Sequence, residues 1–238
     1  MDRIDDGRNL ATVLVLAIDT ATPAVTAGVV QLESDGIPRT LAQRVTVNAK
    51  AHGELLVPHV MDALHEVGRT LANLNAIVCG SGPGPFTGLR VGMVTAAAFG
   101  HALGLPVYPV VSLDAIAADA RAEAGLLVAT DARRREVYWA TYDAAGHRTG
   151  GPGVRRPAEL VSTVSDMDVT TAAGEGAESY ADVVGLPVSS VRYPSPSGLV
   201  AVAAGALLAG AEPGPLTPLY LRRPDAVEPV GRKRVSQP

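Results

Sequence analysis

The chain has 238 residues, of which 47% are hydrophobic and 18% are charged, and its formal net charge is −4 at pH 7. This composition supplies a sizeable core and excludes wholesale disorder, while the acidic balance gives no sign of general nucleic-acid binding. The two lysines, Lys50 and Lys233, stand outside any Gly-Lys-Ser/Thr triplet, which excludes a P-loop. Cys79 is the single cysteine, and the N-terminus lacks the apolar run of a secretory signal. We therefore expect a cytoplasmic protein without a membrane contact.

The first half of the chain predicts three strands followed by alternating helices and strands. Apolar and β-branched runs indicate the strands, and a 3.6-residue apolar spacing indicates the helices. Thr87 and Ser112 are the expected N-caps of two of these helices. The expected strands cover 13–19, 25–31, 40–47, 76–80 and 107–111, and the expected helices cover 52–67, 88–103 and 113–124.

The second half repeats the same order of elements, which suggests an internal duplication. Each copy opens with an apolar strand that ends in an aspartate, Asp19 in the first and Asp131 in the second. The second set of expected strands covers 126–130, 136–142, 147–154, 168–173 and 188–192, and the second set of expected helices covers 157–163, 177–184 and 198–209.

This element order defines a fold class. Three antiparallel strands followed by right-handed crossovers give a mixed sheet with helices on both faces. Two such units leave a cleft between them, into which Asp19 and Asp131 would point from opposite sides. The plan is that of an α/β protein with the duplicated actin-like or Hsp70-like (ASKHA, ribonuclease-H-like) fold and two mixed-sheet domains. We expect a disordered extension over 1–12, actin-like domains over 13–111 and 112–222, and a basic disordered tail over 223–238.

The segment GSGPGPFTGLRVG, residues 80–92, places glycines and two prolines between a strand and a helix. Free N–H groups at the start of such a helix can bind an anion. The spacing does not match the dinucleotide-binding fingerprint, because its third glycine would fall at Thr87. The alternative is a rigid turn that binds nothing.

A row of small residues follows on the helix that begins there, because Gly92, Ala96, Gly100 and Gly104 recur every four residues. An interior glycine costs about 0.5–1 kcal/mol relative to alanine, so a second backbone should come close. That neighbour is either the protein's own sheet or a helix of a partner subunit. The helix over 52–67 has two apolar ridges, so both helices are candidates for an interface. The residues expected to contact a partner are Leu56, Val60, Met61, Leu64, Gly92, Ala96, Gly100 and His101.

Four segments together resemble one family closely. They are VLAIDTATPAVTAGVV (15–30), GSGPGPFTGLRVGMVTAAAFGHALGLPVYPVVSLDAIA (80–117), DARRREVYWATYD (131–143) and PLYLR (218–222). The chain resembles the TsaB (YeaZ) family, the accessory subunit of the bacterial machinery that makes N6-threonylcarbamoyladenosine in tRNA.

The resemblance implies the duplicated actin-like fold and a set of partners. TsaD, which transfers the threonylcarbamoyl group to the adenosine next to the anticodon, would bind the helices over 52–67 and 88–103. A TsaE-like ATPase would join the complex, a homodimer could form, and contact with tRNA would be indirect.

The resemblance also implies that this subunit is not catalytic. TsaD carries a His-x-x-x-His pair for a metal, whereas the matching stretch here, 111–120, has no histidine. The five histidines of the chain lack the i, i+4 spacing that places two ligands on one helical face, so we expect them to be solvated or to cap helices. We expect no metal, no catalytic residue and no required cofactor.

One further set of residues could contact a phosphate. In the actin-like superfamily, aspartates at these strand ends position a magnesium-bound phosphate, and glycine-rich loops follow them. Here three arginines follow Asp131, which argues against ATP turnover. They could contact a phosphate, RNA or an acidic partner, or form a solvated turn. The resulting degenerate nucleotide or phosphate site would use Asp19, Thr20, Thr22, Asp131 and Arg133, and ATP or ADP could also bind at the partner interface. The alternative function is a stand-alone ATPase or kinase that uses Asp19 and Asp131.

Overall fold

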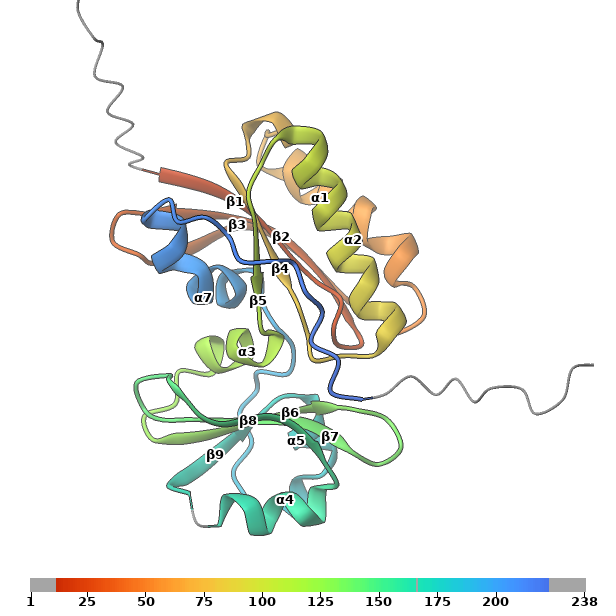
Figure 1. Ribbon diagram of the computed structural model, residues 1–238, viewed down its shortest axis with the longest axis vertical. Helices are drawn as coiled ribbons and strands as arrows, with labels where there is room; N and C mark the ends of the chain where they lie inside the picture. The colour runs from red at the N-terminus through yellow and green to blue at the C-terminus, as the bar shows by residue number, and fades with distance from the viewer. Residues whose placement is uncertain (1–11, 166, 223–238) are drawn as a thin grey trace, which may run out of the picture.

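A five-stranded mixed sheet forms the upper part of the molecule in Figure 1. The computed structural model describes residues 12–165 and 167–222. In this sheet β1 is antiparallel to β2 and parallel to β4, which explains its continuous apolar sequence, since a central strand is covered on both faces. The sheet has the order β3-β2-β1-β4-β5 and consists of β1 (Thr12–Asp19), β2 (Ala24–Glu33), β3 (Pro38–Val47), β4 (Ala76–Gly80) and β5 (Val107–Val110).

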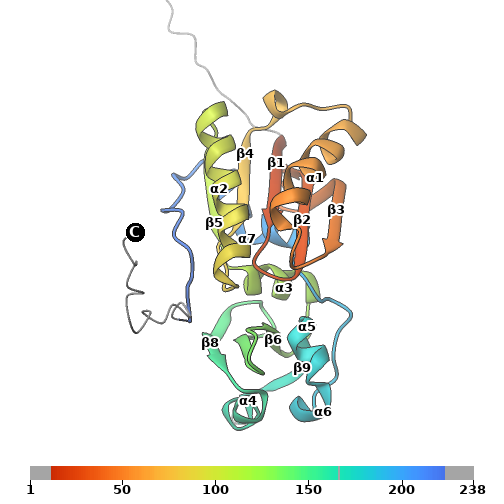
Figure 2. The ribbon, with the colours of Figure 1, turned by 90° about the vertical axis from the view of Figure 1, so that its right-hand side faces the viewer.

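Helices cover both faces of this first sheet. The longer helices α1 (His52–Glu66) and α2 (Phe86–Leu103) lie side by side on one face, as Figure 2 shows. The other face is covered by α7 (Pro196–Leu208), which buries Leu199 and Val200 against β1 and β2. A short 3₁₀ turn, η1 (Leu71–Asn73), precedes β4.

The second sheet has four strands and shorter helices. Its order is β8-β7-β6-β9, and β6 is antiparallel to β7 and parallel to β9. The strands are β6 (Gly125–Asp131), β7 (Val137–Tyr142), β8 (Arg148–Arg155) and β9 (Val169–Ala173), and the helices are α3 (Ser112–Ala120), α4 (Pro157–Val164), α5 (Glu175–Ser179) and α6 (Ala181–Val184).

The two halves exchange one helix each. The apolar face of α3, which ends the first repeat, packs on the second sheet through Leu113 and Ile116. In return α7, which ends the second repeat, packs on the first sheet. The division at residue 112 is therefore wrong for α7: the first domain consists of the first sheet with α1, α2 and α7, and the second domain consists of the second sheet with α3 to α6.

Other boundaries also differ from the expected ones. No strand forms over 188–192, where a single bridge joins Val188 to Ala172, and the helix expected over 177–184 is split into α5 and α6. Thr87 is not an N-cap, because α2 starts at Phe86 and Pro85 holds the N-cap position. Ser112 lies inside α3 rather than capping it.

The expected N-terminal extension and basic tail fall outside the described residues, apart from Thr12, which opens β1. Within 12–165 and 167–222 no helix is long and apolar enough to cross a membrane.

Candidate binding cleft

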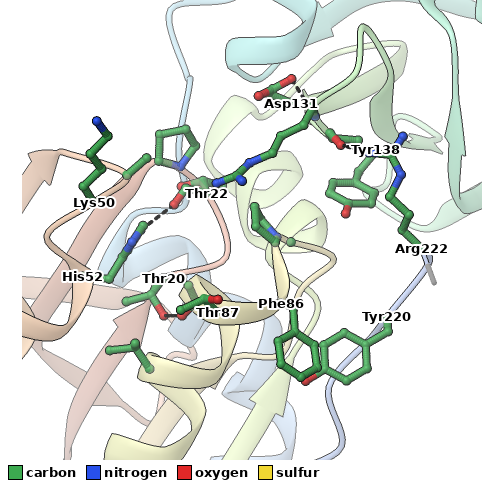
Figure 3. Close-up of a pocket in the computed structure, with 18 of the residues that line it drawn as sticks. Thr20, Thr22, Lys50, His52, Phe86, Thr87, Asp131, Tyr138, Tyr220 and Arg222 are labelled. Carbon is green, nitrogen blue, oxygen red and sulfur yellow. Dashed lines mark hydrogen bonds between the residues drawn. The ribbon is translucent and has the colours of Figure 1, made fainter. Parts of the chain in front are cut away.

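A cleft of about 320 Å³ lies between the two domains. One wall comes from the turn after β1, the start of α1 and the loop before α2, and the other wall comes from the ends of β6 and β7 (Figure 3). Tyr220 and Arg222, from the segment that follows α7, complete the lining.

Segment 218–222 links the two walls. On the first domain the ring of Tyr220 stacks on that of Phe86 with centroids 5.2 Å apart, and Arg90 Nε donates to the Tyr220 hydroxyl at 2.8 Å. On the second domain Arg222 Nη1 donates to the carbonyl of Ala132 at 2.6 Å, and its guanidinium also contacts the Glu136 carboxylate. All four family-like segments, 15–30, 80–117, 131–143 and 218–222, therefore meet at this cleft.

Asp19 lies behind the cleft rather than in it. Its carboxylate is fully buried, where Ser112 Oγ donates to Oδ2 at 2.5 Å and the Ala21 N–H donates to Oδ1 at 2.9 Å. A side chain at residue 80 would overlap Oδ2, so Gly80 is what makes room for this carboxylate. Burial raises its pKa to about 6, although the Ser112 hydrogen bond opposes the shift. The prediction that Asp19 points into the cleft is wrong, because the protein's own groups enclose it.

Thr20, Thr22, Asp131 and Arg133 do line the cleft. Thr20 Oγ1 donates to the Gly88 carbonyl at 2.7 Å and accepts from the Gly92 N–H at 2.8 Å, so it fixes the start of α2. Asp131 Oδ1 accepts from the Arg133 N–H at 2.9 Å. The structure thus brings together four of the five residues of the expected phosphate site.

Two buried polar side chains beside this cleft were not expected. His52 is buried and donates from Nε2 to the Thr22 carbonyl at 2.9 Å, so it is neither solvated nor a cap. Glu175 is only 8% exposed, and its Oε1 accepts from the Asp131 N–H at 3.1 Å. Among the described residues its Oε2 has no hydrogen-bond partner, and burial raises its pKa to about 7. No motif marks Glu175 in the sequence beyond the glycines on either side of it.

The glycine row contacts the chain itself. A Cβ at Gly92 would lie 2.6 Å from Thr20 Oγ1, and one at Gly100 would overlap Val107. Of the two neighbours considered, the protein's own first domain is therefore the one that comes close. A bulky residue at position 100 would disturb the folded monomer.

The expected interface residues divide into two groups. The larger group is buried inside the first domain, so its members offer no surface to a partner, and this part of the prediction is wrong. Met61 and His101 are exposed on the outer side of α1 and α2. The buried members are Leu56, Val60, Leu64, Gly92, Ala96 and Gly100.

Over 12–165 and 167–222, no three His, Cys, Asp or Glu side chains are grouped to hold a metal. The expectation that the whole chain uses no metal stays a prediction.

The duplicated sheets, the exchanged helices and the interdomain cleft define a two-domain α/β protein of the actin-like, ribonuclease-H-like fold class. Residues 41–207 match the family model TsaD, described as tRNA N6-adenosine threonylcarbamoyltransferase. An uncharacterized protein of Mycobacterium tuberculosis is 53% identical over 213 residues, which cover 89% of this chain and 93% of that protein.

Two further matches carry family names. The tRNA threonylcarbamoyladenosine biosynthesis protein TsaB of Escherichia coli is 38% identical over 131 residues, 54% of each chain. The solved structure of YeaZ from Pseudomonas aeruginosa has a TM-score of 0.72 and 30% identity, and the match covers 88% of this chain and 100% of that one. The chain belongs to the TsaB (YeaZ) family, within the wider group that the TsaD model describes.

Proposed function

We propose that this chain is a non-catalytic accessory subunit in the biosynthesis of threonylcarbamoyladenosine in tRNA, and that it binds a TsaD-like subunit, which a TsaE-like ATPase joins. Its similarity to the tRNA threonylcarbamoyladenosine biosynthesis protein TsaB of Escherichia coli supports the pathway. The enclosure of Asp19 supports a non-catalytic role, because an aspartate surrounded by Ser112, Ala21 and Gly80 has no space beside it for a magnesium-bound phosphate. The same geometry gives no support to a stand-alone ATPase or kinase.

The observation that carries the proposal is the exposed apolar face of α1 and α2. Met61 is 47% exposed and Val94 is 66% exposed, and Val57 is also exposed one helical turn before Met61. Ala97 and Ala98 continue the face along α2 and leave room for a close approach. Apolar side chains gathered on one exposed face are typical of a surface that a partner covers.

Co-purification with the TsaD-like subunit of the same organism tests this proposal. We expect the wild-type chain to form a stable complex, and Val94→Glu or Met61→Glu to weaken it at least tenfold, because each buries an unpaired charge in the interface. The matched control is Val202→Glu on α7, which is 38% exposed on the opposite side of the first sheet. A complex that tolerates both α1–α2 variants, or a wild-type chain that neither binds the subunit nor changes its activity, would contradict the proposal.

The same face could also pair two copies of this chain. Light scattering of the purified chain alone measures that association, and Val94→Glu should abolish any homodimer that uses this face. ATP or ADP at the partner interface stays a prediction, which nucleotide titration of the assembled complex would test.

A further inference from the structure

The turn between β6 and β7, residues 132–136, has an unusual backbone. Arg133, Arg134 and Arg135 adopt φ angles of 60°, 54° and 61°. A positive φ is uncommon for residues other than glycine, asparagine and aspartate, and here three consecutive arginines adopt it. We call residues 132–136 the arginine turn.

Contacts at its base hold the arginine turn in this conformation. The Ala132 N–H donates to the Glu136 carbonyl at 2.9 Å, and the Glu136 N–H donates to the Arg133 carbonyl at 3.0 Å. The Asp131 carboxylate accepts the Arg133 N–H, and the Arg222 guanidinium contacts the Ala132 carbonyl and the Glu136 carboxylate, so side chains hold both ends of the turn. Strained backbone of this kind persists where its surroundings over-determine it, and it gathers at ligand-binding sites.

Arginine, rather than glycine, at these three positions therefore needs an explanation. Glycine would adopt the same backbone without the steric cost, so the fold itself does not require arginine at these positions. All three side chains are exposed, and Arg133 reaches the mouth of the cleft. What arginine adds over glycine is an exposed guanidinium group on a backbone of defined conformation.

Two more arginines extend this surface. Arg155, at the end of β8, is paired in register with Val137 at the start of β7, and Arg156 follows it; both are exposed. We call Arg133, Arg134, Arg135, Arg155 and Arg156 the basic patch. It stands out in a chain whose net charge is −4.

The neighbourhood of the basic patch favours a polyanion over a protein. The large hydrophobic side chains exposed by the described residues all lie outside 131–137 and 153–157, whereas the centre of a protein interface is apolar and depleted in charge. At the other rim of the cleft, the stacked rings of Phe86 and Tyr220 are 43% and 37% exposed, and the Arg90 guanidinium lies over the Phe86 ring, 3.8 Å from its centroid. Arginines on one rim of a cleft and aromatic rings on the other suit RNA, whose phosphates pair with guanidinium groups and whose unpaired bases stack on rings.

We infer that the basic patch binds the phosphate backbone of RNA, with the Phe86–Tyr220 pair as a stacking surface for an unpaired base. Identification of that RNA as tRNA rests on the proposed function. The inference replaces the expectation that contact with tRNA is indirect, and an acidic protein partner is the alternative that the test must separate.

Fluorescence anisotropy with a labelled, unmodified tRNA transcript tests the inference on the full chain. We expect Arg133→Glu with Arg135→Glu to weaken binding at least tenfold. The slope of the logarithm of affinity against the logarithm of salt concentration should become shallower by about 2, because two phosphate contacts are lost. The control, Arg39→Glu with Arg69→Glu, makes the same change of charge on the first domain and should alter affinity by no more than about threefold.

A second variant separates loss of binding from loss of folding. Replacing Arg133, Arg134 and Arg135 by glycine removes the guanidinium groups but suits the positive φ angles, so Tm should be unchanged or higher while RNA binding is lost. The inference is overturned if the wild-type chain binds no tRNA, if either turn variant binds like wild type, or if the control loses binding equally.

Co-purification of the same variants with the TsaD-like subunit distinguishes the remaining outcomes. If the turn variants keep the subunit and lose RNA, the inference is supported. If they lose the subunit and keep RNA, the arginine turn is a protein contact, and the inference fails. A chain that never binds the subunit contradicts the proposed function and leaves the RNA result to be judged on its own.

Discussion

The two halves of the chain share the order of their first four strands, although the first sheet adds β5 as a fifth, and they differ where β1 and β6 end. The turn after β1, at residues 20–23, contains no residue with a positive φ, whereas the equivalent turn after β6 has three consecutive arginines there. Asp19 at the end of β1 is fully enclosed, while Asp131 at the end of β6 lies half-buried on the cleft. The helices differ as well: α1 and α2 have 15 and 18 residues, and α4, α5 and α6 have 8, 5 and 4.

This comparison shows how a duplicated fold can divide two tasks. The first half keeps long helices with an exposed apolar face, which suits a protein partner. The second half keeps a small sheet that carries exposed charge near the cleft. The strand order that the two sheets share sets where each surface lies, and the loops and helices around the strands set what each surface can bind.

The largest expected effect tests whether the halves are independent. Ile116 on α3 belongs to the second core and Leu199 on α7 to the first, and both are fully buried. Either residue changed to alanine should lower the free energy of unfolding by about 2–5 kcal/mol. The single tryptophan, Trp139, reports on the second domain during urea unfolding. We expect Leu199→Ala to shift this Trp139 transition although Leu199 lies in the other domain.

An exposed residue of α7, Leu208→Ala, serves as the control and should change stability by less than about 1 kcal/mol. If Leu199→Ala does not shift the unfolding transition reported by Trp139, the two halves unfold separately.

The next effect concerns the buried carboxyls of both halves. Burial raises the pKa of Asp19 to about 6 and that of Glu175 to about 7 in the folded protein, above their ordinary values of 3.8 and 4.5. Between the unfolded and folded pKa values, each of these two carboxyls binds more protons in the folded state than in the unfolded state. The contribution of these two groups to stability is therefore greatest at low pH and falls as pH rises toward 7. Glu175→Gln should remove part of this fall and raise the free energy of unfolding by roughly 1–3 kcal/mol at pH 8.

Urea unfolding at pH 5 and pH 8 measures this difference. At pH 5 the Glu175 carboxyl is protonated in the folded protein, so Glu175→Gln should change stability little there. An equal change at both pH values would show that the carboxylate charge is not what burial disfavours.

A smaller effect compares the two strand-end aspartates directly. At pH 5, Asp19→Ala leaves the buried Ala21 N–H and the Ser112 hydroxyl without their acceptor and should cost about 1–3 kcal/mol. Asp131→Ala removes a half-buried acceptor whose N–H donor, from Arg133, lies at the surface, and should cost under about 1 kcal/mol. Thermal unfolding of the two variants gives the comparison, and equal losses would contradict the difference in their surroundings.

The smallest expected effect concerns turn conformation. Arg135→Gly should leave stability unchanged or raise it by up to about 1 kcal/mol, because glycine adopts a positive φ without a steric cost. The reciprocal change in the first half, Gly36→Arg at φ 73°, should lower the free energy of unfolding by about 1 kcal/mol. Differential scanning calorimetry resolves both. A loss of stability in Arg135→Gly would show that the arginine side chain itself holds the turn.

The order of strands and helices could be predicted from the sequence because apolar periodicity reports which face of an element is buried. The same periodicity does not indicate which neighbouring element buries that face. The apolar side of α3 is visible in the sequence, but its packing on the second sheet depends on residues of β6 and β7, which come later in the chain. The region 188–192 has the β-branched character of a strand yet forms one bridge, because strand pairing depends on the partner as well as on propensity.

The cleft was predictable in outline and not in detail. Thr20, Thr22, Asp131 and Arg133 line it as their positions at strand ends suggest. Asp19 does not, because Gly80 opens a space on its other side that only the three-dimensional structure reveals. The conformation of Arg133–Arg135 was also hidden, since a positive φ is usually signalled by glycine or asparagine.

The contact between the exchanged helices also sets how the molecule can move. Ser195 at the start of α7 donates to Asp119 of α3 at 2.8 Å, and a Cβ at Gly198 would lie 2.5 Å from the Ala115 carbonyl, so the two backbones nearly touch. A hinge that narrowed the cleft would have to shear this contact. This contact therefore resists a change in the spacing between the apolar face of α1 and α2 and the arginine turn, and with it the spacing of any partners bound at those two surfaces.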